Sequence, residues 1–216
     1  MFERFLEYSD TLVPLFSLIA YIKPYKLRKQ ERSLVLYVFL SVVVFGVSNY
    51  MADRGINNMF LYHGFSLFEL LIVLYYASFF FINKKVKSFL VIISIAYIIY
   101  WLLNISIWEP LKEFNSNSAG IAHLIIIIVC GLYFLSLSDK EELLYFQKLP
   151  QFWVMTGFLF YCTCSIPIML SYKYHDIFYD LNQNTAWKIQ VVANFIKFAA
   201  ISYAAICSYK SQDGSS

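Results

Sequence analysis

The sequence predicts an all-α, polytopic integral membrane protein, built as a single bundle of seven transmembrane helices. Its 216 residues are 60% hydrophobic and 14% charged, whereas soluble domains contain about a quarter charged residues. Seven apolar segments reach or approach the roughly 20 residues that a helix needs to cross a bilayer. Phe and Tyr are abundant, at 21 and 18 residues, as expected for side chains that contact lipid chains and headgroups.

The first expected helix, Asp10–Ile22, is the shortest, and it crosses the bilayer only with a tilt or with help from the turns before it. Pro24 follows and stops the helix, because proline cannot donate the next backbone hydrogen bond. The other six segments each have the length and composition of a full span. They are Ser33–Met51, Met59–Ile82, Val86–Trp108, Ser118–Ser138, Gln151–Tyr172 and Thr185–Tyr209.

Short polar connections join these segments, so residues 1–210 are expected to form one domain, followed by a short polar tail at residues 211–216. Pro167 lies inside the sixth segment, where it frees a backbone carbonyl and kinks the helix. The kink is either an ordinary irregularity of membrane helices or a hinge. The two halves of the chain show no internal repeat, which weakens the case for a repeat-built transporter.

The distribution of basic residues predicts the orientation of the bundle. Eleven Lys and Arg residues lie in the first, third and fifth connections or just after the last helix, and five lie on the opposite side. Cytoplasmic loops carry the excess of basic residues in membrane proteins. The N-terminus is therefore expected outside and the C-terminus in the cytoplasm, in a multi-pass protein of a bacterial inner (plasma) membrane.

Lys197 is the most informative residue, because it interrupts an apolar run with a charge that costs a few kcal/mol near the middle of a bilayer. Glu69 lies ten residues into the third helix from the outer face, and Lys197 lies twelve residues into the seventh. At the helical rise per residue, both lie roughly 15–18 Å deep. We therefore expect Glu69 and Lys197 to form an ion pair or a neutral pair that shares a proton.

Polar and aromatic side chains form stripes on three helices, at the spacing of one helix face. The stripes are Tyr62, Ser66, Glu69 and Tyr76 on the third helix, Tyr97, Trp101, Asn104 and Trp108 on the fourth, and Trp187, Gln190, Asn194 and Lys197 on the seventh. Almost all of the polar groups fall in the outer half of the bilayer. A pore needs polar stripes along its whole length, so the pattern favours a cavity that is open outside and closed toward the cytoplasm.

The expected ligand-binding residues of this cavity are Glu69, Lys197, His63, Asn104, His123, Gln190 and Asn194. Packing is the competing interpretation for the uncharged members, because such side chains also join membrane helices by hydrogen bonds of about 1 kcal/mol each. The two histidines are alternatively interfacial groups that water or headgroups satisfy. Helix packing does not require full charges, so Glu69 and Lys197 indicate function.

No catalytic or metal site is predicted. The three histidines lack the spacing of metal ligands, and His175 with Asp176 is only a weak metal candidate. Asp10, Glu69, Asp176 and His123 contain the groups for acid–base chemistry, but no spacing specifies it. The four cysteines lie in apolar segments and are interpreted as core residues. The sequence also has no basic face for nucleic acid.

The gross placement of Lys197 and Glu69 resembles that of the microbial rhodopsins, in which a seventh-helix lysine forms a Schiff base opposite a third-helix carboxylate. The details depart from that family. Ala193 stands four residues before Lys197 in place of an Asp, and the third helix lacks the usual Arg and second carboxylate. The sixth helix lacks the paired tryptophans. No cofactor is therefore expected.

A second resemblance is carried by residues of the third, sixth and seventh helices. They are Glu69, Pro150–Trp153, Gly157, Tyr161, Trp187 and Asn194. In these residues the chain resembles uncharacterised bacterial seven-helix membrane proteins that are similar to the membrane input modules of sensor kinases. The resemblance implies ligand sensing or partner interaction in the membrane, with the output in a separate cytoplasmic or membrane partner.

We therefore expect a receptor-like or interaction protein that senses a small anionic or lipid-derived ligand and acts through a partner. In this interpretation Lys197 meets an anionic group, and Glu69 keeps Lys197 charged and oriented. One alternative is a proton-coupled transporter with a Glu69–Lys197 relay. Another alternative is a membrane-embedded lipid-modifying enzyme, although the sequence favours a non-enzymatic function.

Overall fold

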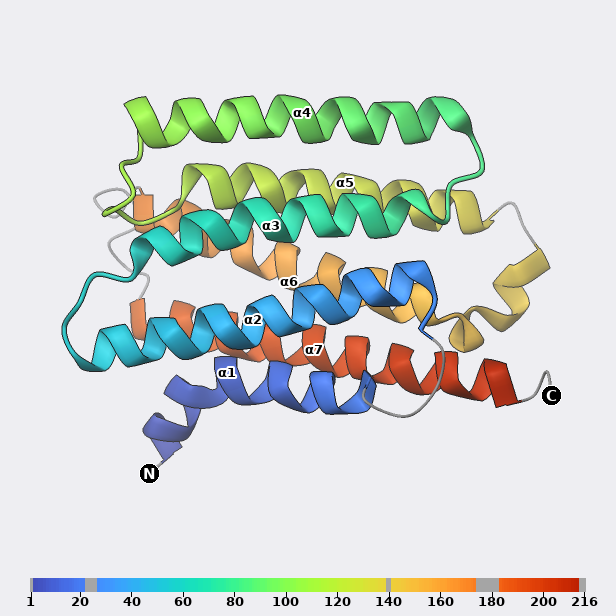
Figure 1. Ribbon diagram of the computed structural model, residues 1–216, viewed down its shortest axis with the longest axis horizontal. Coiled ribbons are helices and arrows are strands. Elements are labelled where there is room, and N and C mark those ends of the chain that lie inside the picture. Colours follow the sequence, from blue (N-terminus) through green and yellow to red (C-terminus); the bar gives the residue numbers. More distant parts are fainter. Residues whose placement is uncertain (1, 22–26, 139–140, 174–182, 214–216) are drawn as a thin grey trace.

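A computed structural model describes residues 2–21, 27–138, 141–173 and 183–213. This part of the chain contains the seven expected helices and no strand. The helices run side by side along the long axis of the molecule (Figure 1). Their bounds are α1 Phe2–Tyr21, α2 Lys29–Asp53, α3 Met59–Ser78, α4 Lys84–Ile107, α5 Asn117–Ser138, the 3₁₀ segment η1 Glu141–Lys148, α6 Pro150–Lys173 and α7 Gln183–Asp213.

Six helices form a closed ring, in the spatial order α1, α2, α3, α5, α6 and α7, with α7 packed against α1. The seventh, α4, lies outside the ring against α3 and touches α5 only slightly, as its peripheral place in Figure 1 shows. Only Leu90, Tyr97 and Asn104 of α4 are buried. The chain order of the helices is therefore not their order around the bundle.

The prediction of a helical membrane protein is confirmed in its coarse form. Among the described residues, the six helices α2 to α7 are long and apolar enough to cross a membrane. The outer face of α4 is a stripe of exposed Ile92, Ile95, Ile99 and Leu102, each more than half accessible. Large contiguous apolar surfaces of this kind mark contact with lipid or with another apolar partner.

Polar contacts fix α1 between α2 and α7. The Ser17 hydroxyl donates to the Phe198 carbonyl at 2.9 Å, and the Ser202 hydroxyl donates to Ser17 at 2.8 Å. On the α2 side, the Asn49 amide donates to the Thr11 hydroxyl at 3.1 Å. The expected stop at Pro24 lies outside the described residues. At Pro167 the helix continues, because α6 runs on to Lys173.

The two ends of the bundle differ in character. The N-terminal end is defined here by the start of α1 and by the α2–α3 and α4–α5 connections (Figure 1). In the half of the bundle away from it, the core includes Leu70, Leu74, Ile126 and Ile201, each at most 2% exposed, and buried Glu31, Ser33 and Ser208 lie near its end. Polar side chains therefore concentrate toward the N-terminal end, as the sequence pattern predicted.

Candidate functional site

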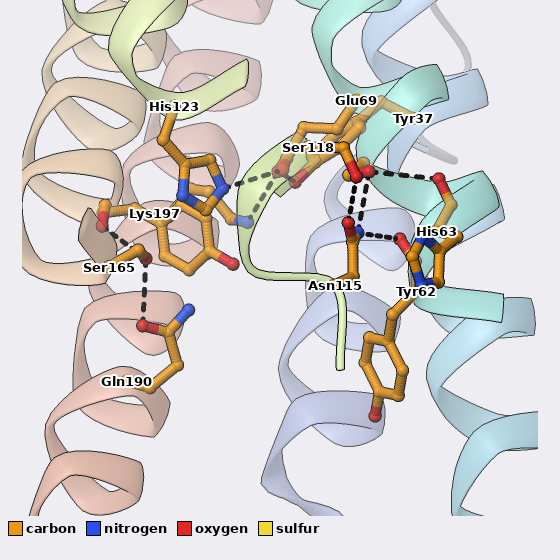
Figure 2. Close-up of polar contacts among 12 residues, drawn as sticks. Tyr37, Tyr62, His63, Glu69, Asn115, Ser118, His123, Ser165, Gln190 and Lys197 are labelled. Atoms are coloured by element: carbon orange, nitrogen blue, oxygen red, sulfur yellow. Dashed lines mark hydrogen bonds and ion pairs between the residues drawn. The ribbon is translucent and has the colours of Figure 1, made fainter. Parts of the chain in front are cut away.

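The carboxylate of Glu69 is the centre of a buried polar cluster. The Tyr37 hydroxyl donates to Glu69 Oε1 at 2.7 Å, and Lys197 Nζ donates to the same oxygen at 3.2 Å. His123 Nε2 lies 3.5 Å from Glu69 Oε2. Figure 2 shows these groups converging from different helices, α2, α3, α5 and α7. The predicted Glu69–Lys197 pair is confirmed.

Lys197 is fully buried, and aromatic rings surround its ammonium group on the sides that Glu69 leaves open. Lys197 Nζ lies 3.5 Å from the ring centroid of Tyr161 and 5.5 and 5.7 Å from those of Tyr37 and Phe158. A cation over a desolvated ring face gains about 2 kcal/mol. The charge of Lys197 is therefore compensated by one carboxylate and by ring faces.

Gly157 allows α6 to approach the backbone of Lys197 closely. A Cβ at position 157 would lie 2.9 Å from the Ala200 Cβ and 3.1 Å from the Lys197 carbonyl oxygen, which is too close for any side chain. The absence of a side chain is thus a condition of the α6–α7 packing at this depth. The position of Lys197 relative to Tyr161 depends on the same contact.

A cavity of about 510 Å³ lies between the cluster and the N-terminal end of the bundle, where it opens to the surface. Glu69 and His123 form its base, where both are at most 2% exposed. Tyr8, Asp53 and Trp187 line its mouth and are exposed. The polar cluster therefore contacts a space that is large enough for a small organic molecule.

The structure brings four of the seven predicted residues to the cavity wall: Glu69, His123, Gln190 and Asn194. Lys197 does not line the cavity, because Glu69 and the aromatic rings cover it. The stripe on α7 is still confirmed, since Trp187, Gln190 and Asn194 face the cavity and Lys197 lies one turn beneath them. The expected contact between Lys197 and an anionic ligand requires Lys197 at the cavity surface, whereas in the structure Lys197 is buried beneath it.

His63 and Asn104 lie away from the cavity and hold the α4–α5 connection. The Trp101 indole donates to the His63 carbonyl at 2.9 Å, and His63 Nε2 lies 3.1 Å from the Glu113 carbonyl oxygen. The Asn104 amide donates to the Glu109 carboxylate at 3.0 Å. For Asn104 the physical reason is the position of α4 outside the ring, from which its polar face reaches this connection and not the cavity. His63 lies on α3, and its ring contacts Glu113 of the same connection.

The buried Glu109 carboxylate caps the start of α5. It accepts hydrogen bonds from the Asn117 backbone amide at 2.7 Å and from the Ser116 hydroxyl at 2.6 Å. A carboxylate at this place satisfies free amide groups and complements the positive end of the helix dipole. The connection is thereby tied to α4 through Asn104 and to α5 through Asn117.

Asn115 presents the same connection to the cavity. Its amide donates to the Tyr62 carbonyl at 3.0 Å and to the Ser66 hydroxyl at 2.9 Å, and its own oxygen accepts from the Ser118 hydroxyl (Figure 2). Asn115 is buried and lines the cavity. The α4–α5 connection thus forms part of the cavity wall, held in place by side chains on three helices.

Sequence reasoning missed Tyr37 and Asn115, named Tyr161 only as part of a family resemblance, and considered Asp10 only for acid–base chemistry. The signal for Tyr37 was a hydroxyl in the middle of the apolar run LVLYVFL. The signal for Asn115 was the polar cluster NSNS just before a helix, which is typical of a capping segment. Asp10 lines the cavity and accepts from the Asn194 amide at 2.8 Å.

The described residues contain no group of three potential ligands that could hold a metal ion. His175 and Asp176, the weak metal candidate, lie outside them. The geometry provides a cavity with carboxylate, amide and imidazole groups at its base, suited to recognition of a polar group on a small molecule. Comparison of this chain with protein-family models, curated proteins and solved structures finds no match.

Proposed function

We propose that this chain is a receptor-like membrane protein that binds a small or lipid-derived molecule in the cavity and acts through a separate partner. One observation carries the proposal: a cavity of about 510 Å³, open at one end, has the buried Glu69–His123–Lys197 cluster at or beneath its base. Ligand sites in proteins commonly have volumes of about 300–1,000 Å³. Ionisable residues at membrane depth are retained mainly for ligands, ions or protons.

The proposal includes α1 as a seventh span. α1 has 20 residues, about 30 Å of helix, and its apolar half follows Asp10, whereas its first turns contain Glu3, Arg4 and Glu7. Leu15, Phe16 and Ile19 form an exposed apolar face, whereas Asp10 and Ser17 point to α7. This is the arrangement of a helix that packs with its polar side against the bundle and with its apolar side against lipid.

The proposed orientation places the N-terminal end outside. Lys84, Lys85 and Lys87 begin α4 at the opposite end, which also carries Lys148 and Lys210. Basic residues prefer the cytoplasmic side of a membrane. In this orientation the cavity opens to the exterior of a bacterial inner membrane, and the basic end offers a surface to a cytoplasmic partner.

The cluster offers a route from ligand to partner. A ligand that displaces Glu69 changes the hydrogen bond and ion pair of Lys197, since both use Glu69 Oε1. The Lys197 backbone packs against Gly157 of α6 without space for a methyl group. Tight packing transmits small shifts between elements, so a displacement of Lys197 is passed to the α6–α7 contact and along these helices.

Blocking the cavity tests the binding function. Ala119 lines the cavity and is 5% exposed, so Ala119→Trp is expected to fill it. The control is Ala96→Trp, on the exposed face of α4. Purified wild type and both variants are screened by thermal stabilisation against a mixed library of small amines, acids, alcohols and lipids.

Compounds that bind in the cavity stabilise the wild type and Ala96→Trp but not Ala119→Trp. The proposal is overturned if no compound stabilises the wild type, or if every active compound stabilises Ala119→Trp equally. The three proteins must first show the same unfolding cooperativity without added compound, so that a folding defect is recognised separately from a loss of binding.

A proton-coupled carrier is the second candidate, favoured by the continuity of the cluster. Three titratable side chains, His123, Glu69 and Lys197, follow one another at 3.5 and 3.2 Å, which is the arrangement of a proton relay. Reconstituted protein with an imposed proton gradient tests this candidate. A carrier is supported if a cavity-binding compound enters the vesicles only with the proton gradient and does not enter with Glu69→Gln. A carrier is contradicted if the compound stays outside the vesicles whether or not the gradient is imposed.

A further inference from the structure

The cavity wall carries negative charge without a matching cation. Its described lining residues include the carboxylates of Asp10, Asp53 and Glu69 and no Lys or Arg. Lys197 compensates Glu69 from behind, through the 3.2 Å contact. An anionic ligand in this space would meet the carboxyl groups of Asp10 and Asp53, whereas Lys197 lies behind Glu69 and outside the cavity lining. Like charges at close range repel.

Asn194, which lines the cavity, has an unused hydrogen-bond acceptor. Its amide nitrogen donates to Asp10 Oδ1 at 2.8 Å. The structure places the amide nitrogen of Asn194, and not its oxygen, against the Asp10 carboxyl group. The other atom of the group, Asn194 Oδ1, is buried and has no hydrogen-bond partner, although Asn194 is 3% exposed and lines the cavity.

His123 offers a second unused acceptor. His123 Nε2 faces Glu69 Oε2 at 3.5 Å, and the carboxylate requires a donor there, so this nitrogen carries the proton. In the tautomer with the proton on Nε2, the His123 Nδ1 is an acceptor. Nδ1 is buried without a partner in a residue that is 2% exposed and lines the cavity.

Aromatic residues form much of the remaining wall. They include Phe45, Tyr62, Phe65, Phe114, Tyr161 and Trp187. Ring faces attract cations and also pack against apolar groups. The wall therefore combines a surface for an apolar body with a surface that favours positive charge.

We propose that the cavity takes an organic amine, in which a protonated N–H-bearing ammonium is attached to an apolar or aromatic body. The proposal rests on the proposed binding function and names its ligand class. The ammonium group supplies donors to Asn194 Oδ1 and His123 Nδ1, and its charge is attracted by the nearby carboxylates. A quaternary ammonium has the charge but no donor, an alcohol has one donor but no charge, and a carboxylate has the wrong charge.

A matched set of four probes tests the ligand class. It consists of 4-phenylbutylamine, 4-phenylbutyltrimethylammonium, 4-phenylbutanol and 5-phenylvalerate. Binding to the full chain in nanodiscs of zwitterionic lipid is measured by direct isothermal titration calorimetry and by thermal stabilisation. The amine is expected to bind at least about tenfold more tightly than each of the other three, because a lost charge-assisted hydrogen bond has an effect of that size.

Two substitutions on α7 identify the contact. Asn194→Leu removes the unused acceptor and is expected to reduce the preference for the amine over the alcohol to within about threefold. Gln190→Met is the matched control, because Gln190 also lines the cavity but its oxygen already accepts from the Ser165 hydroxyl at 2.9 Å. The control should keep the preference. A general packing defect would weaken all four probes together and leave their ratio unchanged.

The outcomes separate the ligand class from the binding function. If the alcohol or the acid binds as tightly as the amine, and Ala119→Trp abolishes that binding, the amine proposal is wrong and the cavity still binds ligands. Equal binding of the amine and its trimethyl analogue also overturns the proposal, since it removes the role of the N–H donors. If no probe and no library compound binds the wild type, the binding function itself fails.

Discussion

Replacing Glu69 with Gln is expected to destabilise the bundle by about 3–4.5 kcal/mol, because Lys197 then stays buried without a counter-ion. Lys197 is 0% exposed, and apart from Glu69 Oε1 its nearest charge-stabilising neighbours are aromatic rings. The penalty has an upper bound, since a lysine without a partner can lose its proton. From an ordinary lysine pKa near 10.4 to pH 7, that loss costs about 4.6 kcal/mol.

The reverse substitution should cost less. In Lys197→Met, Glu69 keeps its contacts with the Tyr37 hydroxyl at 2.7 Å and with His123 Nε2 at 3.5 Å. We expect a loss of about 1–3 kcal/mol. In the double variant both charges are gone, so its stability should be close to that of Lys197→Met. The coupling energy between the two positions should then equal the cost of Glu69→Gln, about 3–4.5 kcal/mol.

Reversible unfolding of the purified protein in mixed detergent, followed by circular dichroism, provides the four free energies of this double-mutant cycle. Asp53→Asn serves as the control, because Asp53 is an exposed carboxylate at the cavity mouth. Additive effects of the two substitutions, within about 0.5 kcal/mol, would refute the pairing argument. A smaller loss in Glu69→Gln than in Lys197→Met would refute the asymmetry.

Three further substitutions test other contacts by the same unfolding measurement. Gly157→Ala should destabilise the protein by about 1–3 kcal/mol through overpacking against Ala200. In the control Gly131→Ala the new Cβ meets no atom within 4 Å, so this change should be neutral or stabilising by up to about 1 kcal/mol. Equal effects of the two substitutions would contradict the close approach of α6 to α7. Glu109→Gln should cost about 1–2 kcal/mol by weakening the cap of α5, and no loss relative to wild type would exclude that role. Tyr37→Phe should cost about 1.5–3 kcal/mol through its bond to a charged acceptor; a neutral effect would show that Glu69 does not depend on it.

The sequence predicted the helices and their polar faces well, because both follow from local spacing. The matching depth of Glu69 and Lys197 was enough to pair them, since an unpaired charge in a membrane is costly whatever the arrangement of helices. The faces of α3 and α7 were also correct, and three side chains of the α7 stripe line one cavity. Depth and helical phase were therefore enough to predict the Glu69–Lys197 pair and the cavity-facing sides of α3 and α7.

The sequence did not show which helices pack against each other. Helical phase says which side chains share a face, but it does not say which helix that face meets. Asn104 has the right depth and phase for the cavity, yet α4 lies outside the ring and α5 takes the place beside α3. Tyr37 lies on α2 in an apolar run that faces both lipid and core, so its own pattern gave no direction.

The closure of the ring by α1 and α7 has a consequence for biogenesis. The Asn194–Asp10 contact spans 184 residues and the Ser17–Phe198 contact spans 181, so α1 can pack against α2 early in synthesis but meets α7 only much later. Contacts of such sequence separation form late, because a long chain must be ordered before they are made. The wall that contains Asp10 and Asn194 is therefore completed only after the whole ring has been inserted. Truncated or stalled chains contain the α3 and α5 groups of the site but have no enclosed space around them.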